Sequence, residues 1–213
     1  MIAGSYLCMQ ILNDFNKPIM ADKIKILAIS GSTRKSSSNL NLIKAIAELT
    51  SETFTITVFE ELSDLPHFNP DLDNENPPEQ VTSFRRQLRK ADGIIICTPE
   101  YAMGVPGTLK NAIDWTVSSM EFSKKPLALI TASLSGEKAH ASLLGTLLII
   151  EAQMTTDTQL LIPFIKTKVD GNGKITDNET LNNINKLIAS LKEIIIDDST
   201  KLLSAPILMN EDK

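Results

Sequence analysis

The chain has 213 residues, of which 42% are hydrophobic, and a formal net charge of −5. This length and apolar content predict one domain with a sizeable core and short appendages. The acidic balance argues against a nucleic-acid binder, which needs a basic face, and no apolar run approaches the roughly 18 residues that cross a bilayer. We therefore expect neither nucleic acid nor a membrane among its partners.

The two cysteines, Cys8 and Cys97, lie far apart in the sequence and form no CxxC pair or His/Cys cluster. This spacing predicts no metal site, and Cys97 reads as an inert core thiol in a reducing, cytoplasmic setting. Residues 1–22 lack a positively charged start, which argues against a secretory signal. We expect an N-terminal extension at 1–22, one domain at 23–200 and a C-terminal tail at 201–213.

Apolar runs alternate with helical patterns along the chain. The apolar runs predict strands at 24–30, 54–60, 93–99, 126–133 and 158–164. The periodic segments predict helices from Ser37 or Ser38 to about Thr50, and at 79–92, 106–119, 137–152 and 177–196. Residues 62–78, rich in Pro, Asn and Asp, predict a long loop.

Strands that alternate with helices predict an α/β domain built on a parallel sheet. The loops after the first and third strands have unusual chemistry. In a flavodoxin-like, three-layer sandwich with five parallel strands in the order 2-1-3-4-5, strands 1 and 3 are neighbours at the point where ligands bind. We therefore expect the two loops to flank one crevice.

The first of these loops is GSTRKSSSN at 31–39, which gathers hydroxyl side chains and the cation Arg34 at the start of a predicted helix. It matches neither GxGxxG nor the Walker pattern. A helix N-terminus offers free N–H groups and partial positive charge, and Arg34 can add a charge-assisted hydrogen bond. This set suits a single terminal phosphate. A solvated Ser-rich turn that caps the helix is the open alternative.

The second loop lies within TPEYAMGVPGTLKNAIDW at 98–115. Pro99 stiffens the exit from the strand, and the planar side chain of Tyr101 can lie against a planar ring. The backbone N–H groups of Tyr101 to Gly104 can bond to the polar edge of such a ring. The alternative is that Tyr101 packs on the protein and Glu100 is solvated.

The segments ISGSTRKSSSNLNL and ADGIIICTPEYAMGVPGTLKNAIDW resemble the NADPH-dependent FMN reductase family. This flavodoxin-like group includes chromate, quinone and azo-dye reductases. The order of strands and helices agrees with the family over residues 24–196. The resemblance implies FMN as the cofactor and NAD(P)H as the hydride donor, and it implies a homodimer or homotetramer.

The resemblance also implies positions for the cofactor. The flavin phosphate would be held by Ser32, Arg34, Ser38 and Asn39. The isoalloxazine ring would be lined by Pro99, Glu100, Tyr101, Ala102 and Met103.

Two features depart from the family pattern. Ala102 stands where the family usually has Asn, and SLSGEKAHASL at 133–143 lacks the usual glycine pair and Arg. Ser133, Ser135 and Gly136 remain candidates for covering the flavin. The change in this loop leaves the choice of substrate open.

Other residues of the motifs receive structural roles. His140 is expected on a helix surface and His67 at the border of the crevice or of a partner subunit, with no catalytic role for either. Asp114 and Trp115 are expected to serve local pairing and packing.

The expected function is an FMN-dependent NAD(P)H oxidoreductase that passes hydride to a flavin, a quinone or a similar small acceptor. The cofactor carries the hydride chemistry, so we expect no catalytic acid or base. A non-catalytic flavin-binding electron carrier or redox-responsive module is one alternative. A phosphate-binding α/β protein without a redox role is the other.

Overall fold

The structure is a computed structural model that describes residues 22–34, 36–170 and 173–206. The predicted extension at 1–22 lies outside the described residues except for Asp22, and so does the end of the predicted tail, at 207–213. Within the part described, no helix combines the length and apolar character that spanning a membrane requires.

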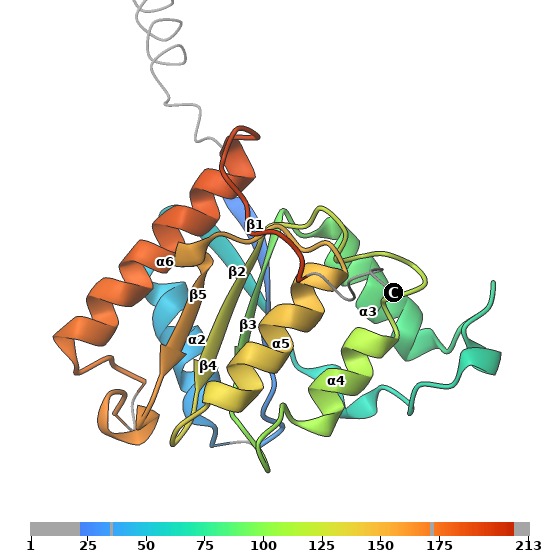
Figure 1. The fold of residues 1–213 in the computed structure, drawn as a ribbon, viewed down its shortest axis with the longest axis horizontal. Coiled ribbons are helices and arrows are strands. Elements are labelled where there is room, and N and C mark those ends of the chain that lie inside the picture. The colour runs from blue at the N-terminus through green and yellow to red at the C-terminus, as the bar shows by residue number, and fades with distance from the viewer. Residues whose placement is uncertain (1–21, 35, 171–172, 207–213) are drawn as a thin grey trace, which may run out of the picture.

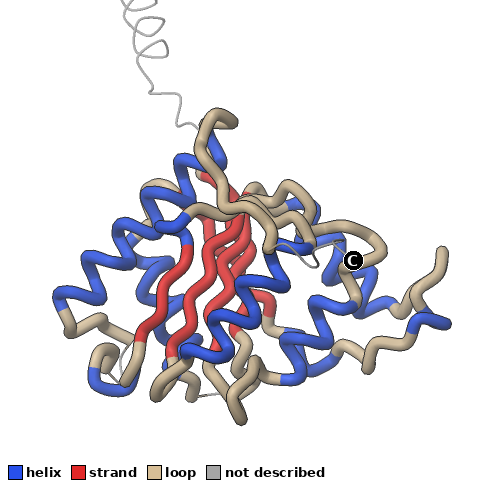
Figure 2. Tube along the Cα trace, viewed as in Figure 1, coloured by secondary structure: helices blue, strands red, loops and turns tan. Residues whose placement is uncertain are grey.

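A parallel five-stranded sheet forms the centre of the domain (Figure 2). Its strands are β1 (Ile24–Ser30), β2 (Phe54–Phe59), β3 (Gly93–Thr98), β4 (Leu127–Ala132) and β5 (Gln159–Ile162). The spatial order is β2-β1-β3-β4-β5, with every neighbouring pair parallel. This confirms the predicted flavodoxin-like order.

Helices cover both faces of the sheet, which makes three layers (Figure 1). The α-helices are α2 (Ser38–Leu49), α3 (Glu79–Lys90), α4 (Gly107–Asp114), α5 (Glu137–Ile149) and α6 (Asn178–Ile196). Short 3₁₀ helices are η1 (Glu61–Asp64), η2 (Pro70–Leu72), η3 (Thr156–Thr158) and η4 (Ile165–Thr167).

Alternate residues of each strand enter two separate cores, because successive side chains of a strand point to opposite faces. In β3, Ile94 and Ile96 pack with α3, α4 and α5, whereas Ile95 and Cys97 pack with α2 and α6. Both faces are therefore buried, which explains why the sequence of each central strand is almost continuously apolar.

Helix α4 is shorter than the sequence predicts. The pattern predicted a helix at 106–119, but α4 ends at Asp114, and Val117, beyond its end, is exposed. The guanidinium of Arg85 donates to the carbonyl oxygen of Trp115, and the hydroxyl of Thr116 donates to the carbonyl oxygen of Ile113. Beyond the helix, the N–H groups of Thr116 and Val117 donate to the carbonyl oxygens of Ile113 and Asp114, three residues back, so the α-helical pattern gives way to tighter turns.

Strand β5 is also shorter than the predicted 158–164. Pro163 has no N–H group to donate to a strand neighbour, and Phe164 has a φ of +54° that turns the chain. The strand therefore stops at Ile162, and the chain enters η4 at the edge of the sheet.

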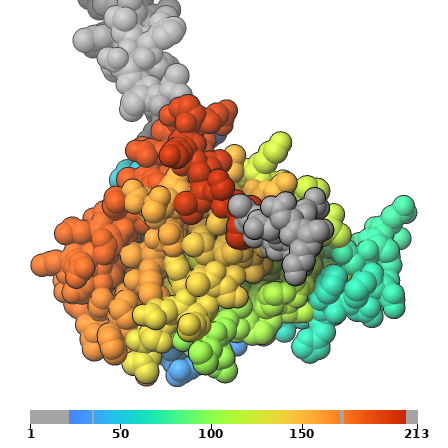
Figure 3. All heavy atoms as spheres, viewed as in Figure 1, coloured from blue at the N-terminus to red at the C-terminus, as the bar shows by residue number. Residues whose placement is uncertain are grey.

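The long loop between β2 and α3 is fastened to the domain at two points. The indole Nε1 of Trp115, which is fully buried, donates to the carbonyl oxygen of Pro66 at 2.8 Å. Arg85 forms a 2.7 Å ion pair with Asp73. Part of the segment still stands out from the body, at the right of Figure 3. The packing role predicted for Trp115 is confirmed, and so is the Lys110–Asp114 pair, at 2.5 Å.

The carboxyl ends of all five parallel strands meet at one edge of the sheet, the lower edge in Figure 1. The loops that follow β1, β3, β4 and β5 gather there. Because this edge carries the chemistry singled out in the sequence, it is where the site lies.

Candidate flavin site

The loops after β1 and β3 are in direct contact. Ser30 pairs with Cys97 at the ends of the two strands, and the N–H of Gly31 donates to the carbonyl oxygen of Cys97 at 2.9 Å. A Cβ atom on Gly31 would lie 2.3 Å from Oγ1 of Thr98, so only glycine fits there. The predicted convergence of the two loops is therefore confirmed.

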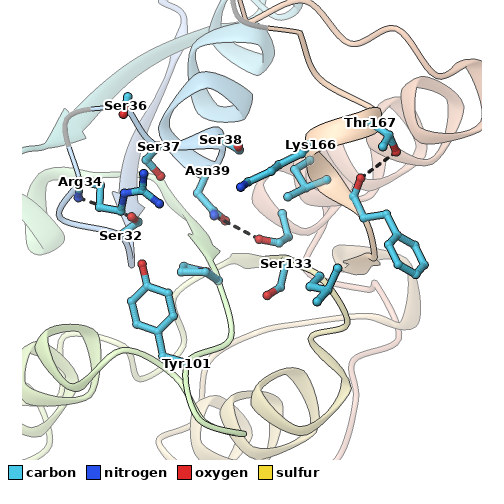
Figure 4. Close-up of a pocket in the computed structure, with 15 residues that line it drawn as sticks. Ser32, Arg34, Ser36, Ser37, Ser38, Asn39, Tyr101, Ser133, Lys166 and Thr167 are labelled. Carbon is cyan, nitrogen blue, oxygen red and sulfur yellow. Dashed lines mark hydrogen bonds between the residues drawn. The ribbon is translucent and has the colours of Figure 1, made fainter.

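A cavity of about 370 Å³ opens beside this contact, a size typical of small-molecule sites (Figure 4). Four loops build its wall. It is lined by Ser32, Arg34, Ser36, Ser37, Ser38, Asn39, Pro99, Tyr101, Ala132, Ser133, Leu134, Phe164, Ile165, Lys166 and Thr167. Seven predicted site residues are among them: Ser32, Arg34, Ser38, Asn39, Pro99, Tyr101 and Ser133.

One end of the cavity is polar and lies at the N-terminus of α2. Ser37 is the N-cap, and its hydroxyl accepts from the N–H of Leu40 at 3.5 Å. Ser38 begins the helix, where the first N–H groups have no intrahelical partner. The hydroxyl of Ser32 and the exposed Arg34 face the same end. Hydrogen-bond donors and positive charge therefore gather at this end of the cavity, as the sequence predicted.

Asn39 lines the cavity, but its side-chain amide is already engaged. Nδ2 donates to the carbonyl oxygen of Ala132 at 3.1 Å, and Oδ1 accepts from the thiol of Cys97 at 3.2 Å. Asn39 therefore joins α2 to β3 and β4 below the cavity. Cys97 is fully buried, and this burial raises the pKa of its thiol, so the predicted inert core thiol is confirmed.

Tyr101 stands at the mouth of the cavity on a tight turn. Tyr101 and Gly104 exchange both backbone hydrogen bonds, at 2.8 and 3.0 Å. Their N–H groups are therefore not free for a ring edge, and that part of the sequence interpretation is wrong. The N–H groups left for a ligand are those of Ala102 and Met103, which have φ values of +49° and +65°.

Glu100 is only partly buried and does not line the cavity, but its carboxylate is hydrogen-bonded to the protein. Its carboxylate accepts from the N–H of Ala139 at 2.9 Å and from the hydroxyl of Ser135 at 3.2 Å. Hydrogen bonds from the first turn of α5 lower the pKa of Glu100, Ala139 contributing most. The N–H of Glu100 donates to the hydroxyl of Ser133 at 3.2 Å. Glu100 thus joins the loop after β3 to the loop after β4.

The remaining predicted residues lie in these two loops outside the cavity wall. They are Ala102, Met103, Ser135 and Gly136. Gly136 is the N-cap of α5 with a φ of +98°, and a Cβ there would lie 2.9 Å from Leu161. Their contacts with a flavin remain predictions.

The loop after β5 contributes part of the wall that the sequence interpretation missed. Phe164, Ile165, Lys166 and Thr167 line the cavity from this side. The available signal was topological, because a loop that follows a strand of a parallel sheet emerges at the same edge as the others. Its residues carry no motif of their own.

His140 is a correction to the sequence interpretation. It is not a surface residue but half-buried, with Nδ1 2.9 Å from Oγ1 of Thr131 and Nε2 2.7 Å from Oε1 of Gln159. Burial lowers the pKa of His140, although the hydrogen bond with Gln159 opposes this. His67 is exposed and is not among the residues that line the cavity.

The fold defines a flavodoxin-like protein, and the lining of the cavity suits a phosphorylated, partly apolar ligand. FMN fits the residues present, because Arg34, serine hydroxyls and a helix N-terminus stand at one end while Pro99, Tyr101 and Leu134 provide an apolar wall. In addition, the described part of the chain places no carboxylate in the cavity wall to repel a phosphate.

Comparisons with known proteins agree with this class. Residues 24–167 match the NADPH-dependent FMN reductase family. An NAD(P)H-dependent FMN reductase of Pseudomonas aeruginosa is 32% identical over 178 residues, which cover 81% of this chain and 96% of that protein. A quinone reductase of Escherichia coli is 28% identical over 183 residues, covering 83% of this chain and 97% of that one.

Among solved structures, the flavoenzyme NAD(P)H:(acceptor) oxidoreductase FerB of Paracoccus denitrificans aligns with a TM-score of 0.72 and 28% identity. The alignment covers 81% of this chain and 97% of FerB. This chain belongs to the NADPH-dependent FMN reductase family. The resemblance found in the sequence is thereby confirmed, and so is its assignment as an oxidoreductase.

Proposed function

We propose that this protein oxidises NAD(P)H with FMN held in the cavity, and that it passes the electrons to a small quinone or a flavin. The observation that carries the proposal is the cavity itself, which has phosphate-binding chemistry at one end and an apolar wall at the other. The relatives named as quinone reductase and FMN reductase support both the activity and the class of acceptor.

The polar end would hold the phosphate of FMN. The hydroxyls of Ser32 and Ser38 donate to phosphate oxygens, and Arg34 adds a charge-assisted hydrogen bond. The N-terminus of α2 supplies unpaired N–H groups and partial positive charge. The side chain of Asn39 keeps this helix in place through Cys97 and Ala132.

The other end would hold the isoalloxazine ring. Pro99 and Tyr101 form an apolar wall, and the free N–H groups of Ala102 and Met103 can donate to the polar edge of the ring. Such preorganised donors stabilise negative charge that develops on the ring edge during reduction. Glu100 fixes this loop against α5, so the donors are held before the ligand arrives.

Bound FMN supplies the ability to accept a hydride and to release electrons again. Among its described residues, the chain places no Asp, Glu or His at the cavity wall, and we assign no proton transfer to the titratable side chains that are there, Arg34, Tyr101 and Lys166. Its contribution is therefore to bind, to orient and to exclude water. One open mouth would serve the nicotinamide and the acceptor in turn.

The experiment is spectroscopic. We expect the purified protein to be yellow or to acquire a bound-flavin spectrum with added FMN, and to consume NAD(P)H steadily when a quinone is present. A protein that takes up no FMN would contradict the proposal. A protein that binds FMN but oxidises NAD(P)H negligibly would instead be the electron carrier or redox-responsive module.

The proposal extends to assembly and location. A homodimer or homotetramer accords with the exposed apolar side chains of Val117, Met120 and Ile149, which follow α4 or end α5. The free, buried thiol of Cys97 accords with a cytoplasmic location. Sedimentation of the holoprotein tests the predicted homodimer or homotetramer, because a monomer at micromolar concentration would contradict it.

A further inference from the structure

A second cation faces the polar end of the cavity from the side opposite Arg34. Lys166 belongs to η4, after β5, and its side chain extends toward Asn39 and Ser38 (Figure 4). We propose that Lys166 binds the phosphate of FMN, so that the phosphate is held between two cations and the N-terminus of α2. This inference rests on the proposed function and adds a residue to its site.

The backbone that carries Lys166 is held firmly. The N–H groups of Phe164 and Ile165 donate to the carbonyl oxygens of Leu134 and Ser133, both at 3.2 Å. Ile165 is buried in the core beside α2 and α6. The hydroxyl of Thr167 closes the turn on the carbonyl oxygen of Phe164 at 2.9 Å. Lys166 therefore projects from a fixed support, as an effective ligand-binding residue needs.

Lys166 forms no ion pair with the residues that the structure describes. Lys110 and Lys186 form ion pairs with carboxylates at 2.5 and 2.8 Å, but the Lys166 ammonium has neither an ion pair nor a side-chain hydrogen bond in that part of the chain. The described residues of the cavity wall also include Arg34 and no carboxylate. Arg34, Lys166 and the N-terminus of α2 all place positive charge at this cavity. That charge favours the binding of an anionic ligand.

The position of Lys166 favours a terminal phosphate monoester. Its ammonium points toward the start of α2, where the serine hydroxyls gather. A terminal phosphate has three oxygens free to accept from separate directions, so α2, Arg34 and Lys166 can each bond to one of them. A phosphate group of NAD(P)H could bind to the same residues. The experiment below distinguishes it from the phosphate of FMN.

The test compares FMN with riboflavin, which has the same ring but no phosphate. Apoprotein is titrated with each flavin, and the dissociation constant is read from flavin fluorescence. We expect Lys166→Gln to weaken FMN binding about 10-fold and to leave riboflavin binding within about 2-fold, because a charge-assisted bond to phosphate is lost. Lys166→Arg should restore most of the FMN affinity. Lys168→Gln, in the same loop but outside the cavity wall, is the matched control.

Each alternative result has a defined meaning. Equal weakening of FMN and riboflavin, or unchanged FMN affinity, would overturn the role of Lys166 while leaving FMN binding intact. A higher KM for NADPH but not for NADH, with FMN affinity unchanged, would also overturn it and would place the dinucleotide phosphate beside Lys166. Wild-type protein that binds neither flavin would remove the proposed function and this inference together.

Discussion

The carboxylate of Glu100 and the N–H of Ala139 lie 2.9 Å apart, although Glu100 is in the loop after β3 and Ala139 is in the first turn of α5, which follows β4. This bond makes the turn that carries Tyr101 and the first turn of α5 one unit. A carboxylate at a helix N-terminus also interacts favourably with the helix dipole. The wall of the flavin site therefore depends on a contact between the loops after β3 and β4.

The first prediction concerns this contact. The pKa of Glu100 is lowered, so its contribution to stability is present above the unfolded value near 4.5 and is lost as the pH falls through the folded pKa. We expect Glu100→Gln to lower the melting temperature at pH 7, and the difference from wild type to shrink below pH 4.5. Glu137→Gln, also in the first turn of α5, should have little effect. A melting temperature unchanged by Glu100→Gln at pH 7 would contradict the idea.

The second prediction concerns Arg34. Because its exposed guanidinium is placed to bond a phosphate, we expect Arg34→Ala to weaken FMN binding about 10-fold and riboflavin binding far less. Titration of apoprotein by fluorescence measures both. Arg86→Ala, exposed on α3, is the control for a general loss of positive charge. Equal FMN affinity in wild type and Arg34→Ala would disprove the phosphate role.

The third prediction concerns the turn at Ala102 and Met103. Both residues have positive φ values, which Asn tolerates better than Ala does. We expect Ala102→Asn to raise the free energy of unfolding by about 0.5 kcal/mol, and Ala102→Val to lower it by about 1 kcal/mol, because a β-branched side chain crowds this conformation. Urea denaturation measures both changes. The same sign for the two variants would show that backbone strain is not the cause.

The fourth prediction concerns His140. Its pKa is lowered in the folded state, so the unfolded chain binds more protons once the pH falls below its unfolded value near 6.5. We expect the free energy of unfolding to decrease as the pH falls from 7.5 through 6.5 and further until the folded pKa is passed. His140→Gln should flatten this part of the curve. A wild-type free energy of unfolding that stays constant over this pH range would refute the prediction.

The fifth prediction concerns Gly31. A Cβ there would lie 2.3 Å from Oγ1 of Thr98 and 2.8 Å from its Cβ, so the two loops would have to separate. We expect Gly31→Ala to cost about 2 kcal/mol or more of stability and to weaken FMN binding. Gly107→Ala, where a Cβ meets nothing within 4 Å, should change stability by less than about 0.5 kcal/mol. Equal stability of the two variants would contradict this account.

Local patterns in the sequence specified much of this protein. The apolar runs specified the strands, since residues buried on both faces must all be apolar, and the predicted bounds of β1 agree with the structure. The chemistry of the loops after β1 and β3 then predicted where the candidate site lies, because parallel strands bring their carboxyl ends to one edge. Ser32, Arg34 and Tyr101 were found in this way and line one cavity.

The tertiary structure decided how individual side chains are used. Glu100 caps α5, the amide of Asn39 bonds to β3 and β4, and Lys166 reaches the cavity from a loop with no motif. The guanidinium of Arg85 likewise bonds to the carbonyl oxygen of Trp115, 30 residues away in sequence. Periodicity records which face of an element is buried, but it does not record which distant group that face meets. Those partners are set only when the sheet brings the loops together.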